Sequence, residues 1–230
     1  MSTIQLVVFD IAGTTVRDRG NVADSFITAF REFGLEIPAS AVEKVMGFRK
    51  MDAIVHLLGK FAPAQKDDEI LVDRIHSRFI QNMISFYMND EELEPLPHAP
   101  EVFARLKQQG IKVALNTGFT RAITDTILHR LRWDERNENI DKVICSDEVP
   151  EGRPSPDMID ALVADLGITS TKNVLKIGDT EVDVEEGRNA GCGKVVSVTT
   201  GAYTREQLQH YQPDAIIDDL LELIPIIEKA

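Results

Sequence analysis

Residues 7–15 read Val-Val-Phe-Asp-Ile-Ala-Gly-Thr-Thr, and this short stretch decides the fold. It closes an apolar run that begins at Ile4 and is interrupted only by Gln5, a composition typical of a buried strand. The run ends at Asp10, and the glycine and threonines that follow predict a tight turn. Ligands of open α/β sheets bind beyond the carboxyl ends of the strands, so Asp10 is placed to act as a nucleophile, a metal ligand or both. An aspartate that only caps the next turn is the alternative.

Apolar segments alternate with amphipathic ones along most of the chain. This order predicts an α/β fold with a doubly wound parallel sheet that is covered by helices on both faces. Six segments have the length and composition of strands, namely 4–10, 111–117, 142–146, 174–179, 194–199 and 215–217. Helical patterns occupy residues 100–109, 121–131, 156–166, 183–190 and 219–228.

The segment from about residue 20 to residue 89 breaks this alternation. It holds no convincing strand, but apolar residues recur in it at helical spacing, and polar residues bracket it at both ends. We therefore expect a core domain of residues 1–17 and 92–230 and a helical domain of residues 18–91, inserted beside the strand ends as a lid. The helical runs are Val22, Phe26, Phe30 and Phe33; Ile54, Leu57 and Leu58; and Ile75, Phe79, Met83 and Phe86.

The Asp-x-Ala-Gly-Thr-Thr motif at residues 10–15 resembles the opening motif of the haloacid dehalogenase (HAD) superfamily, in its phosphonoacetaldehyde hydrolase (phosphonatase) branch. The resemblance covers nearly the whole chain, because the family has a Rossmann-like core and an inserted helical cap in the same order. It implies that Asp10 is the nucleophile. Most HAD phosphatases carry a second aspartate two residues later, as acid and base for the leaving oxygen, but this chain has Ala12 there. Without that acid, the site suits a leaving group that is stabilised by other means.

Two further motifs match the family at positions that would hold a phosphoryl group. Residues 116–118 read Asn-Thr-Gly at the end of an expected strand, and the resemblance assigns the phosphate-binding hydroxyl to Thr117, beside the backbone N–H of Gly118. The Gly-Arg-Pro run at 152–154 matches the cationic motif of the phosphonatase branch, in which Arg153 would bind the phosphonate. Taken alone, residues 116–118 would be an ordinary turn, and Arg153 would be an exposed arginine in a loop.

An apolar segment at 174–178 is followed by Asp179 and, four residues further on, by Asp183. Carboxylate oxygens beside a phosphoryl site are the ligands that Mg²⁺ prefers. The predicted magnesium ligands are Asp10, Asp179 and the carbonyl oxygen of Ala12, with Asp183 as a weaker ligand or a residue that orients the others. Lys176 lies within the strand, and we interpret it as mainly structural.

The run Met-Gly-Phe-Arg-Lys at residues 46–50 resembles the phosphonatase cap motif Met-Gly-x-x-Lys, whose lysine forms a Schiff base with the substrate aldehyde. On this match the glycine is Gly47 and the lysine is Lys50. A protonated imine withdraws electrons, so cleavage of a P–C bond would release an enamine instead of a bare carbanion. The alternative is that Lys50 only binds an anionic group. The chain departs from the family at Ala53, where members carry histidine; near Asn21, where they carry cysteine; and at Phe119, where they carry tyrosine.

The composition narrows the classes of partner. With 25 basic and 38 acidic residues, the chain has a net charge of −13, which argues against binding to nucleic acid or to anionic membranes. The two cysteines, Cys145 and Cys192, form no disulfide framework and lack the spacing of a metal site. We see no signal peptide and no apolar run near the roughly 20 residues that span a bilayer, so we expect a cytoplasmic protein. The oligomeric state stays open, with a homodimer as one possibility.

The predicted function is Mg²⁺-dependent hydrolysis of a small phosphonate aldehyde through an aspartyl-phosphate on Asp10, with Lys50 as the Schiff-base lysine. The first alternative is a phosphate-monoester phosphatase, similar to phosphoglycolate phosphatase, in which Lys50 only binds the substrate. The second is a catalytically weak protein that keeps the HAD fold and binds a phosphorylated ligand. Ala12 disfavours ester hydrolysis, because an alkoxide leaving group needs a proton as it departs.

Overall fold

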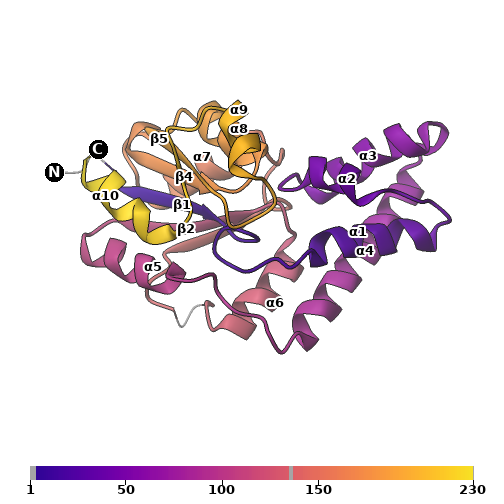
Figure 1. The fold of residues 1–230 in the computed structure, drawn as a ribbon, viewed down its shortest axis with the longest axis horizontal. Helices are drawn as coiled ribbons and strands as arrows, with labels where there is room; N and C mark the ends of the chain where they lie inside the picture. Colours follow the sequence, from indigo (N-terminus) through magenta and orange to yellow (C-terminus); the bar gives the residue numbers. More distant parts are fainter. Residues whose placement is uncertain (1–3, 135–136, 230) are drawn as a thin grey trace.

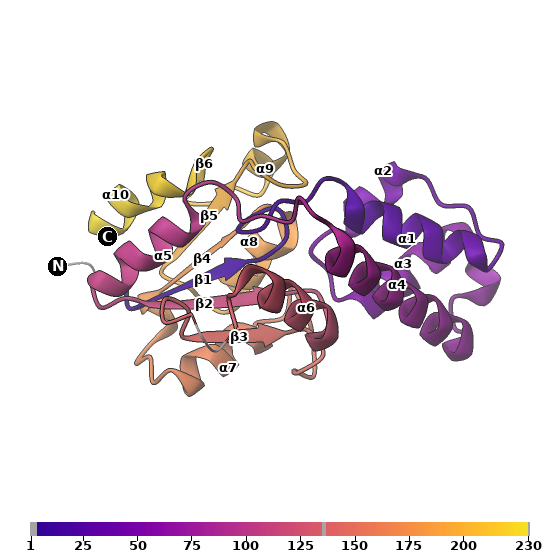
Figure 2. The same ribbon diagram turned by 90° about the horizontal axis from the view of Figure 1, so that it is seen from below.

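The computed structural model describes residues 4–134 and 137–229. Its centre is a six-stranded sheet in which all neighbouring strands run parallel. The order β3-β2-β1-β4-β5-β6 shows that the chain extends the sheet first on one side of β1 and then on the other (Figures 1 and 2). The predicted doubly wound sheet is therefore confirmed. Its strands are β1 (Leu6–Asp10), β2 (Lys112–Thr117), β3 (Lys142–Cys145), β4 (Val174–Gly178), β5 (Lys194–Val198) and β6 (Ala215–Ile217).

The two faces of the sheet bury separate apolar cores, because successive side chains of a strand point to opposite faces. Val7 and Phe9 of β1 belong to one core, whereas Leu6 and Val8 belong to the other. On the first face the Phe9 ring meets Phe103 edge-on, with ring centroids 5.0 Å apart. Helices α5 (Ala99–Gln108), α6 (Arg121–Leu131) and α10 (Leu223–Glu228) cover this face, and α7 (Asp157–Asp165) and α8 (Glu181–Asn189) cover the other.

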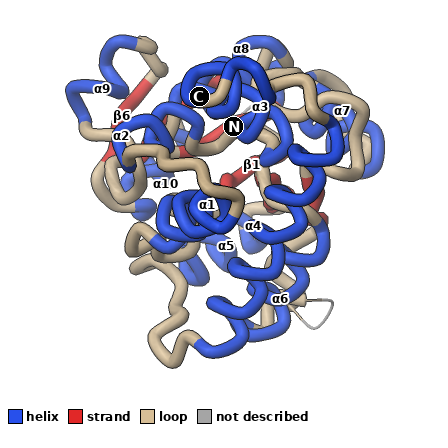
Figure 3. The backbone as a smooth tube through the Cα atoms, turned by 90° about the vertical axis from the view of Figure 1, so that its right-hand side faces the viewer, coloured by secondary structure: helices blue, strands red, loops and turns tan. Residues whose placement is uncertain are grey.

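A group of helices between β1 and β2, here called the helical insertion, stands beyond the carboxyl ends of the strands (Figures 1 and 2). Viewed from that end, α1, α3 and α4 lie in front of the sheet (Figure 3). The rings of Phe26 and Phe79 join α1 to α4, with centroids 4.3 Å apart. The last helical run differs from its prediction, since Tyr87 is buried and Phe86 only half-buried. The insertion consists of α1 (Asn21–Glu32), α2 (Ala39–Val42), α3 (Lys50–Phe61) and α4 (Glu69–Asn89).

The chain leaves the sheet for the helical insertion and returns from it along two paired segments. The N–H of Leu96 donates to the carbonyl of Thr15 at 2.8 Å, and the N–H of Arg17 donates to the carbonyl of Glu94 at 3.3 Å. Val16 forms an isolated antiparallel bridge with Pro95. The two connections thus make a short two-stranded strap.

Most element boundaries agree with the sequence-based expectation to within two residues. The exception is α9 (Arg205–His210), a short helix that the apolar pattern does not predict. Its signal is a capping box, in which Thr204 and Gln207 bind each other's backbone N–H groups. Within the described ranges, no helix combines the length and hydropathy needed to cross a membrane.

Candidate active site

A cavity of about 20 Å³ lies where the helical insertion meets the carboxyl ends of β1, β2 and β4. It is large enough for roughly one water molecule. It brings together seven of the predicted site residues from four separate parts of the sequence. The lining residues are Asp10, Ala12, Val22, Met46, Gly47, Lys50, Thr117, Gly118, Phe119, Asp179 and Thr180.

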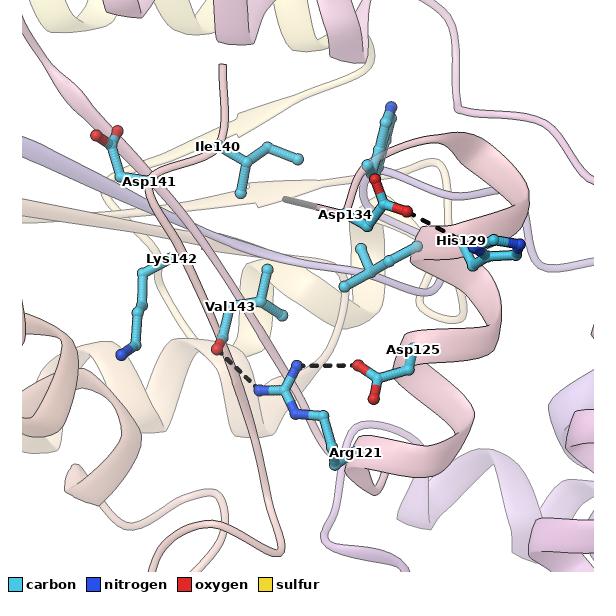
Figure 4. Close-up of a pocket in the computed structure, with 10 residues that line it drawn as sticks. Arg121, Asp125, His129, Asp134, Ile140, Asp141, Lys142 and Val143 are labelled. Carbon is cyan, nitrogen blue, oxygen red and sulfur yellow. Dashed lines mark hydrogen bonds and ion pairs between the residues drawn. The ribbon is translucent and has the colours of Figure 1, made fainter. Parts of the chain in front are cut away.

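A larger cavity of about 710 Å³ lies elsewhere, between α6 and the edge strand β3 (Figure 4). The charged residues that line it already have partners. Arg121, for example, lies 3.3 Å from Asp125 and donates to the carbonyl of Val143 at 2.9 Å. None of the predicted site residues lines it. We therefore take the smaller cavity as the candidate active site.

Asp10 is the last residue of β1, and its carboxylate lines the cavity with 5% of the residue exposed. Burial raises the pKa of Asp10, and the nearby Asp183 adds to the rise, whereas Arg153 and Lys176 oppose it. Its oxygen Oδ1 lies 2.6 Å from Arg153 Nη1. The strand end therefore presents a buried carboxylate that is held by one cation, which suits a nucleophile of fixed orientation.

Asp179 directly follows β4 and faces the same cavity. Its Oδ2 accepts a hydrogen bond from the N–H of Ala202 at 2.6 Å, and its Oδ1 accepts one from Thr14 at 3.3 Å. The approach of this carboxylate requires a glycine at position 201, because a Cβ there would lie 1.9 Å from Oδ2. Burial, Asp10 and Asp183 raise the pKa of Asp179 well above its usual range. Among the described residues, no lysine or arginine forms an ion pair with it.

The charge balance around the cavity floor fits a divalent cation. Four buried carboxylates, those of Asp10, Asp179, Asp183 and Glu186, accompany three buried cations, Arg153, Lys176 and Lys50. Burial lowers the pKa of Lys50 to about 8, so the carboxylates outnumber the positive charges in a site that is closed to solvent, which is costly without a further counter-charge. Asp10, Asp179 and the carbonyl of Ala12 supply hard oxygen donors of the kind that Mg²⁺ binds.

Asp183 is predicted to be either a weaker metal ligand or a residue that orients the others. Its side chain does not line the cavity, and its Oδ2 accepts hydrogen bonds from the hydroxyl of Thr180 at 2.6 Å and from its N–H at 3.2 Å. Its Oδ1 lies 3.0 Å from Arg153 Nη1 and 2.9 Å from Lys176 Nζ. Both oxygens lie against neighbouring polar or cationic groups, which fits the role of a residue that orients the others, and metal binding by Asp183 stays a prediction.

Arg153 also lies behind the cavity and not in it. The residue is 1% exposed, and its guanidinium contacts Asp10 and Asp183 through Nη1 and Asn116 through Nη2. We predicted that Arg153 binds substrate; in the structure its guanidinium lies against Asp10, and direct contact with substrate stays a prediction. Lys176, also fully buried, lies among Asn116, Asp183 and Glu186, in agreement with its structural interpretation.

Thr117 and two glycines form the contact between the strand ends and the helical insertion. Thr117 lines the cavity, and its Oγ1 accepts a hydrogen bond from the N–H of Phe119 at 3.1 Å. A Cβ at Gly118 would lie 2.6 Å from the carbonyl oxygen of Gly47. Gly47 has φ +80°, and a Cβ there would lie 2.5 Å from Thr180 Oγ1. Only glycine at these two positions lets the loop before α3 approach the sheet so closely.

Lys50 begins α3 and reaches the cavity from the side opposite Asp10's strand, with 3% of the residue exposed. Its Nζ donates to the carbonyl of Phe48 at 3.1 Å and lies 5.8 Å from the centre of the Phe26 ring and 5.1 Å from that of Phe119. Burial lowers the pKa of Lys50 to about 8, although the carboxylate of Asp10 opposes the shift. A substantial fraction of this amine is therefore neutral near pH 8, as nucleophilic attack requires.

Of the three departures from the family pattern, Phe119 contacts this lysine and Ala53 follows it by one turn of α3. Ala53 is fully buried, one turn further along α3. Phe119 offers a ring face where a hydroxyl is expected, and the amide of Asn21 donates to the hydroxyl of Tyr87 at 3.3 Å. The rings of Phe26 and Phe119 face Lys50, and its burial is the physical cause of its lowered pKa.

Comparison with known proteins agrees with this site. Residues 4–191 match the family model described as haloacid dehalogenase-like hydrolase. The phosphonoacetaldehyde hydrolase of Syntrophobacter fumaroxidans is 32% identical over 236 residues, covering 98% of this chain and 83% of the relative. That of Bordetella pertussis is 30% identical, covering 97% of this chain and 91% of the relative.

Solved structures share the fold. A phosphonoacetaldehyde hydrolase-like protein from Oleispira antarctica superposes with a TM-score of 0.84 at 24% identity, covering 99% of this chain and 92% of that one. A predicted phosphoglycolate phosphatase from Haemophilus somnus gives a TM-score of 0.77 at 21% identity, covering 98% of this chain and 99% of that one. With its match over most of the sequence and its curated relatives at 30% identity or more, the chain belongs to the haloacid dehalogenase-like hydrolase family.

Proposed function

We propose that this hydrolase cleaves the P–C bond of a small phosphonate aldehyde of the phosphonoacetaldehyde type. The observation that carries the proposal is the placement of a buried, partly neutral lysine and a buried aspartate on opposite sides of one closed cavity. Such a pair activates both ends of a two-carbon substrate, the aldehyde at Lys50 and the phosphonate at Asp10. The names of the curated relatives support the same reaction.

In this mechanism the Lys50 amine attacks the aldehyde carbon, and loss of water gives a protonated imine. Asp10 then attacks phosphorus, the P–C bond breaks, and its electron pair moves towards the iminium nitrogen to form an enamine. Protonation of the enamine carbon and hydrolysis of the imine release the aldehyde, now without its phosphonate group, and free Lys50. Water hydrolyses the aspartyl-phosphate to inorganic phosphate and free Asp10.

The other predicted residues hold the phosphoryl group and the nucleophile. The hydroxyl of Thr117 and the N–H of Gly118 face the cavity and would bind phosphoryl oxygens, while Arg153 orients Asp10. Asp10, Asp179 and the carbonyl of Ala12 would hold Mg²⁺. When bound, the cation supplies positive charge that offsets the charge of the phosphonate oxygens.

Ala12 is consistent with this leaving group. An enamine departs without taking a proton from the enzyme, so no acid is needed at position 12. The methyl group of Ala12 and the side chains of Val22 and Met46 give the cavity an apolar wall. An ester-cleaving site would instead need a proton donor beside the leaving oxygen.

The small cavity volume requires the helical insertion to move when substrate enters. About 20 Å³ is too small for a phosphonate aldehyde, so the described conformation is closed. We propose that residues 18–91 form a cap that opens over a core of residues 1–17 and 92–230, and that the strap is its hinge.

The second candidate is a phosphate-monoesterase in which Lys50 only binds an anion. The loss of a titratable neighbour at Ala53 favours it, because imine formation is assisted by proton transfer. A substrate panel separates the two: phosphonoacetaldehyde is tested against phosphoglycolate and sugar phosphates, with borohydride added in parallel. Turnover of the phosphonate aldehyde and a reduced adduct on Lys50 support the proposal. Turnover of esters alone, without an adduct, overturns it.

A further inference from the structure

A buried polar network behind the cavity contains two side chains to which the reaction above assigns no role, Asn116 and Glu186. Both residues have 0% exposure. Asn116 is the register partner of Asp10 in the β1–β2 ladder, and Glu186 lies in the α8 helix. Buried carboxylates are retained only where they are paired and hydrogen-bonded, so the partners of Glu186 indicate what it does.

Asn116 connects both cations of the network to Glu186. Its Oδ1 accepts hydrogen bonds from Arg153 Nη2 at 2.6 Å and from Lys176 Nζ at 2.8 Å. Its Nδ2 lies 2.8 Å from Oε1 and 2.9 Å from Oε2 of Glu186. This orientation of the amide is the only one compatible with its neighbours, because the reverse would place an NH₂ group against two cations.

Glu186 completes the set of groups around the Arg153 guanidinium. Its Oε2 lies 3.1 Å from Arg153 Nε, an ion-pair distance at which Nε makes no hydrogen bond. Nη1 meets Asp10 and Asp183, and Nη2 meets Asn116. Rotation of the guanidinium plane would therefore break the contacts of Nη1 and Nη2 and weaken the ion pair with Glu186.

We propose that Asn116 and Glu186, the Asn116–Glu186 pair, are positioning residues that hold Arg153 on Oδ1 of Asp10 and so select Oδ2 as the attacking oxygen. The inference rests on the proposed role of Asp10 as nucleophile, but not on the identity of the substrate. It applies equally to a phosphonate and to a phosphate ester. The pair acts through Arg153 and makes no contact with the cavity.

The pair can be tested by reversing its polarity. Glu186→Gln removes a charge, and Asn116→Asp adds one, each with little change of shape. Each single variant misplaces Arg153, so we expect kcat to fall at least tenfold while KM changes less than threefold. The double variant, Asn116→Asp with Glu186→Gln, restores the net charge and one amide–carboxylate hydrogen bond in the opposite direction, so it should recover most of the lost kcat.

Glu185→Gln is the matched control, since it removes the same charge from an exposed neighbouring position of α8 and should leave kcat unchanged. A crystal structure of Glu186→Gln supplies a readout that needs no turnover, because the contact between Arg153 Nη1 and Asp10 Oδ1 should lengthen or break. Wild-type kcat in both single variants, or a double variant no better than the poorer single one, overturns the proposal. If one single variant does not fold, the proposal is tested by the kcat of the double variant and by the distance between Arg153 Nη1 and Asp10 Oδ1 in the variant that folds. Failure of the proposed function appears separately, as turnover without a Lys50 adduct.

Discussion

Arg153 reaches Asp10 from behind, with Nη1 2.6 Å from Oδ1 and with both side chains buried. Arg153 does not line the cavity, so the cation stabilises the ionised carboxylate without occupying the space in front of it. Burial raises the pKa of Asp10, and this ion pair opposes the rise. The ion pair therefore favours the ionised form of Asp10 against the effect of burial.

Asp10→Asn should abolish turnover while preserving the fold. The amide keeps an oxygen for Arg153 but cannot form an acyl-phosphate, so kcat should fall by at least about 10⁴-fold. Steady-state kinetics and circular dichroism measure the two effects. Activity above about a tenth of the wild-type rate would exclude Asp10 as the nucleophile.

Lys50→Arg should remove cleavage of phosphonoacetaldehyde but keep any activity on phosphate esters, because the guanidinium keeps the charge and cannot form an imine. In the wild-type protein the rate of imine formation should rise with pH and level off above about 8, the pKa to which burial lowers Lys50. Single-turnover measurements between pH 6 and 9.5 test this. Lys60→Arg, at an exposed position of the same helix, is the control and should behave as wild type.

The same lysine predicts how stability depends on pH. Its pKa is about 8 in the folded protein and 10.5 as a free side chain, so the unfolded state binds more protons between these values and stability rises with pH across that range. Lys50→Met removes the free-energy cost of burying a charged amine. It should increase the free energy of unfolding at pH 7 by roughly 1–3 kcal/mol, with the gain vanishing towards pH 10.5. Urea unfolding at pH 7 and 9.5 tests the prediction, which an equal effect at both values would contradict.

Mg²⁺ should be needed for activity and should stabilise the protein. Excess chelator should abolish turnover, and added Mg²⁺ should restore it. Bound Mg²⁺ should also raise the melting temperature, because at 100 times its Kd it stabilises the folded protein by about 2.7 kcal/mol. Asp179→Asn should lose the response to Mg²⁺, yet melt no lower than the wild type in chelator, because the cost of a buried carboxylate is gone. Thermal melts of both proteins with and without Mg²⁺ decide the matter. Full activity in excess chelator would rule out this metal site.

Gly118→Ala should prevent closure of the helical insertion. Its Cβ would lie 2.4 Å from the carbonyl oxygen of Phe48, a contact with backbone that cannot turn aside. We expect kcat/KM to fall at least tenfold with little loss of stability, since open conformations relieve the clash. Gly59→Ala is the matched control, because the nearest atom to its Cβ is 4.0 Å away. Unchanged kinetics in Gly118→Ala would show that the closed contact is not needed.

The doubly wound parallel sheet and the ends of its strands could be predicted from the sequence, because each strand is an apolar run followed by a turn. The cavity lining was also largely predicted, since the residues after β1, β2 and β4 meet wherever parallel strands end together. Helix α9 was missed because one buried residue, Leu208, gives no apolar period. Tyr87 was missed because the last turn of α4 packs against Phe119 of the core.

The network behind Asp10 could not be predicted. Asn116 follows an apolar run like any turn residue, and Glu186 stands in a stretch of α8 with a strongly polar sequence, so both resemble solvent-exposed positions. Their burial depends on α8 lying over β4, a long-range contact that no local pattern encodes. For the same reason the sequence left Asp183 between a metal ligand and an orienting residue: its position in the chain was evident, but the direction of its side chain was not.

The strap separates the helical insertion from the order of the strands in the sheet. Because Arg17 and Glu94 are already hydrogen-bonded neighbours, the polypeptide leaves and re-enters the sheet at a single point. With respect to the sheet, the whole helical insertion is therefore equivalent to the loop of one hairpin. The length and sequence of the insertion can change without altering the order of the strands. Evolution can therefore change the helical side of the cavity while Asp10 and the buried network behind it stay unchanged.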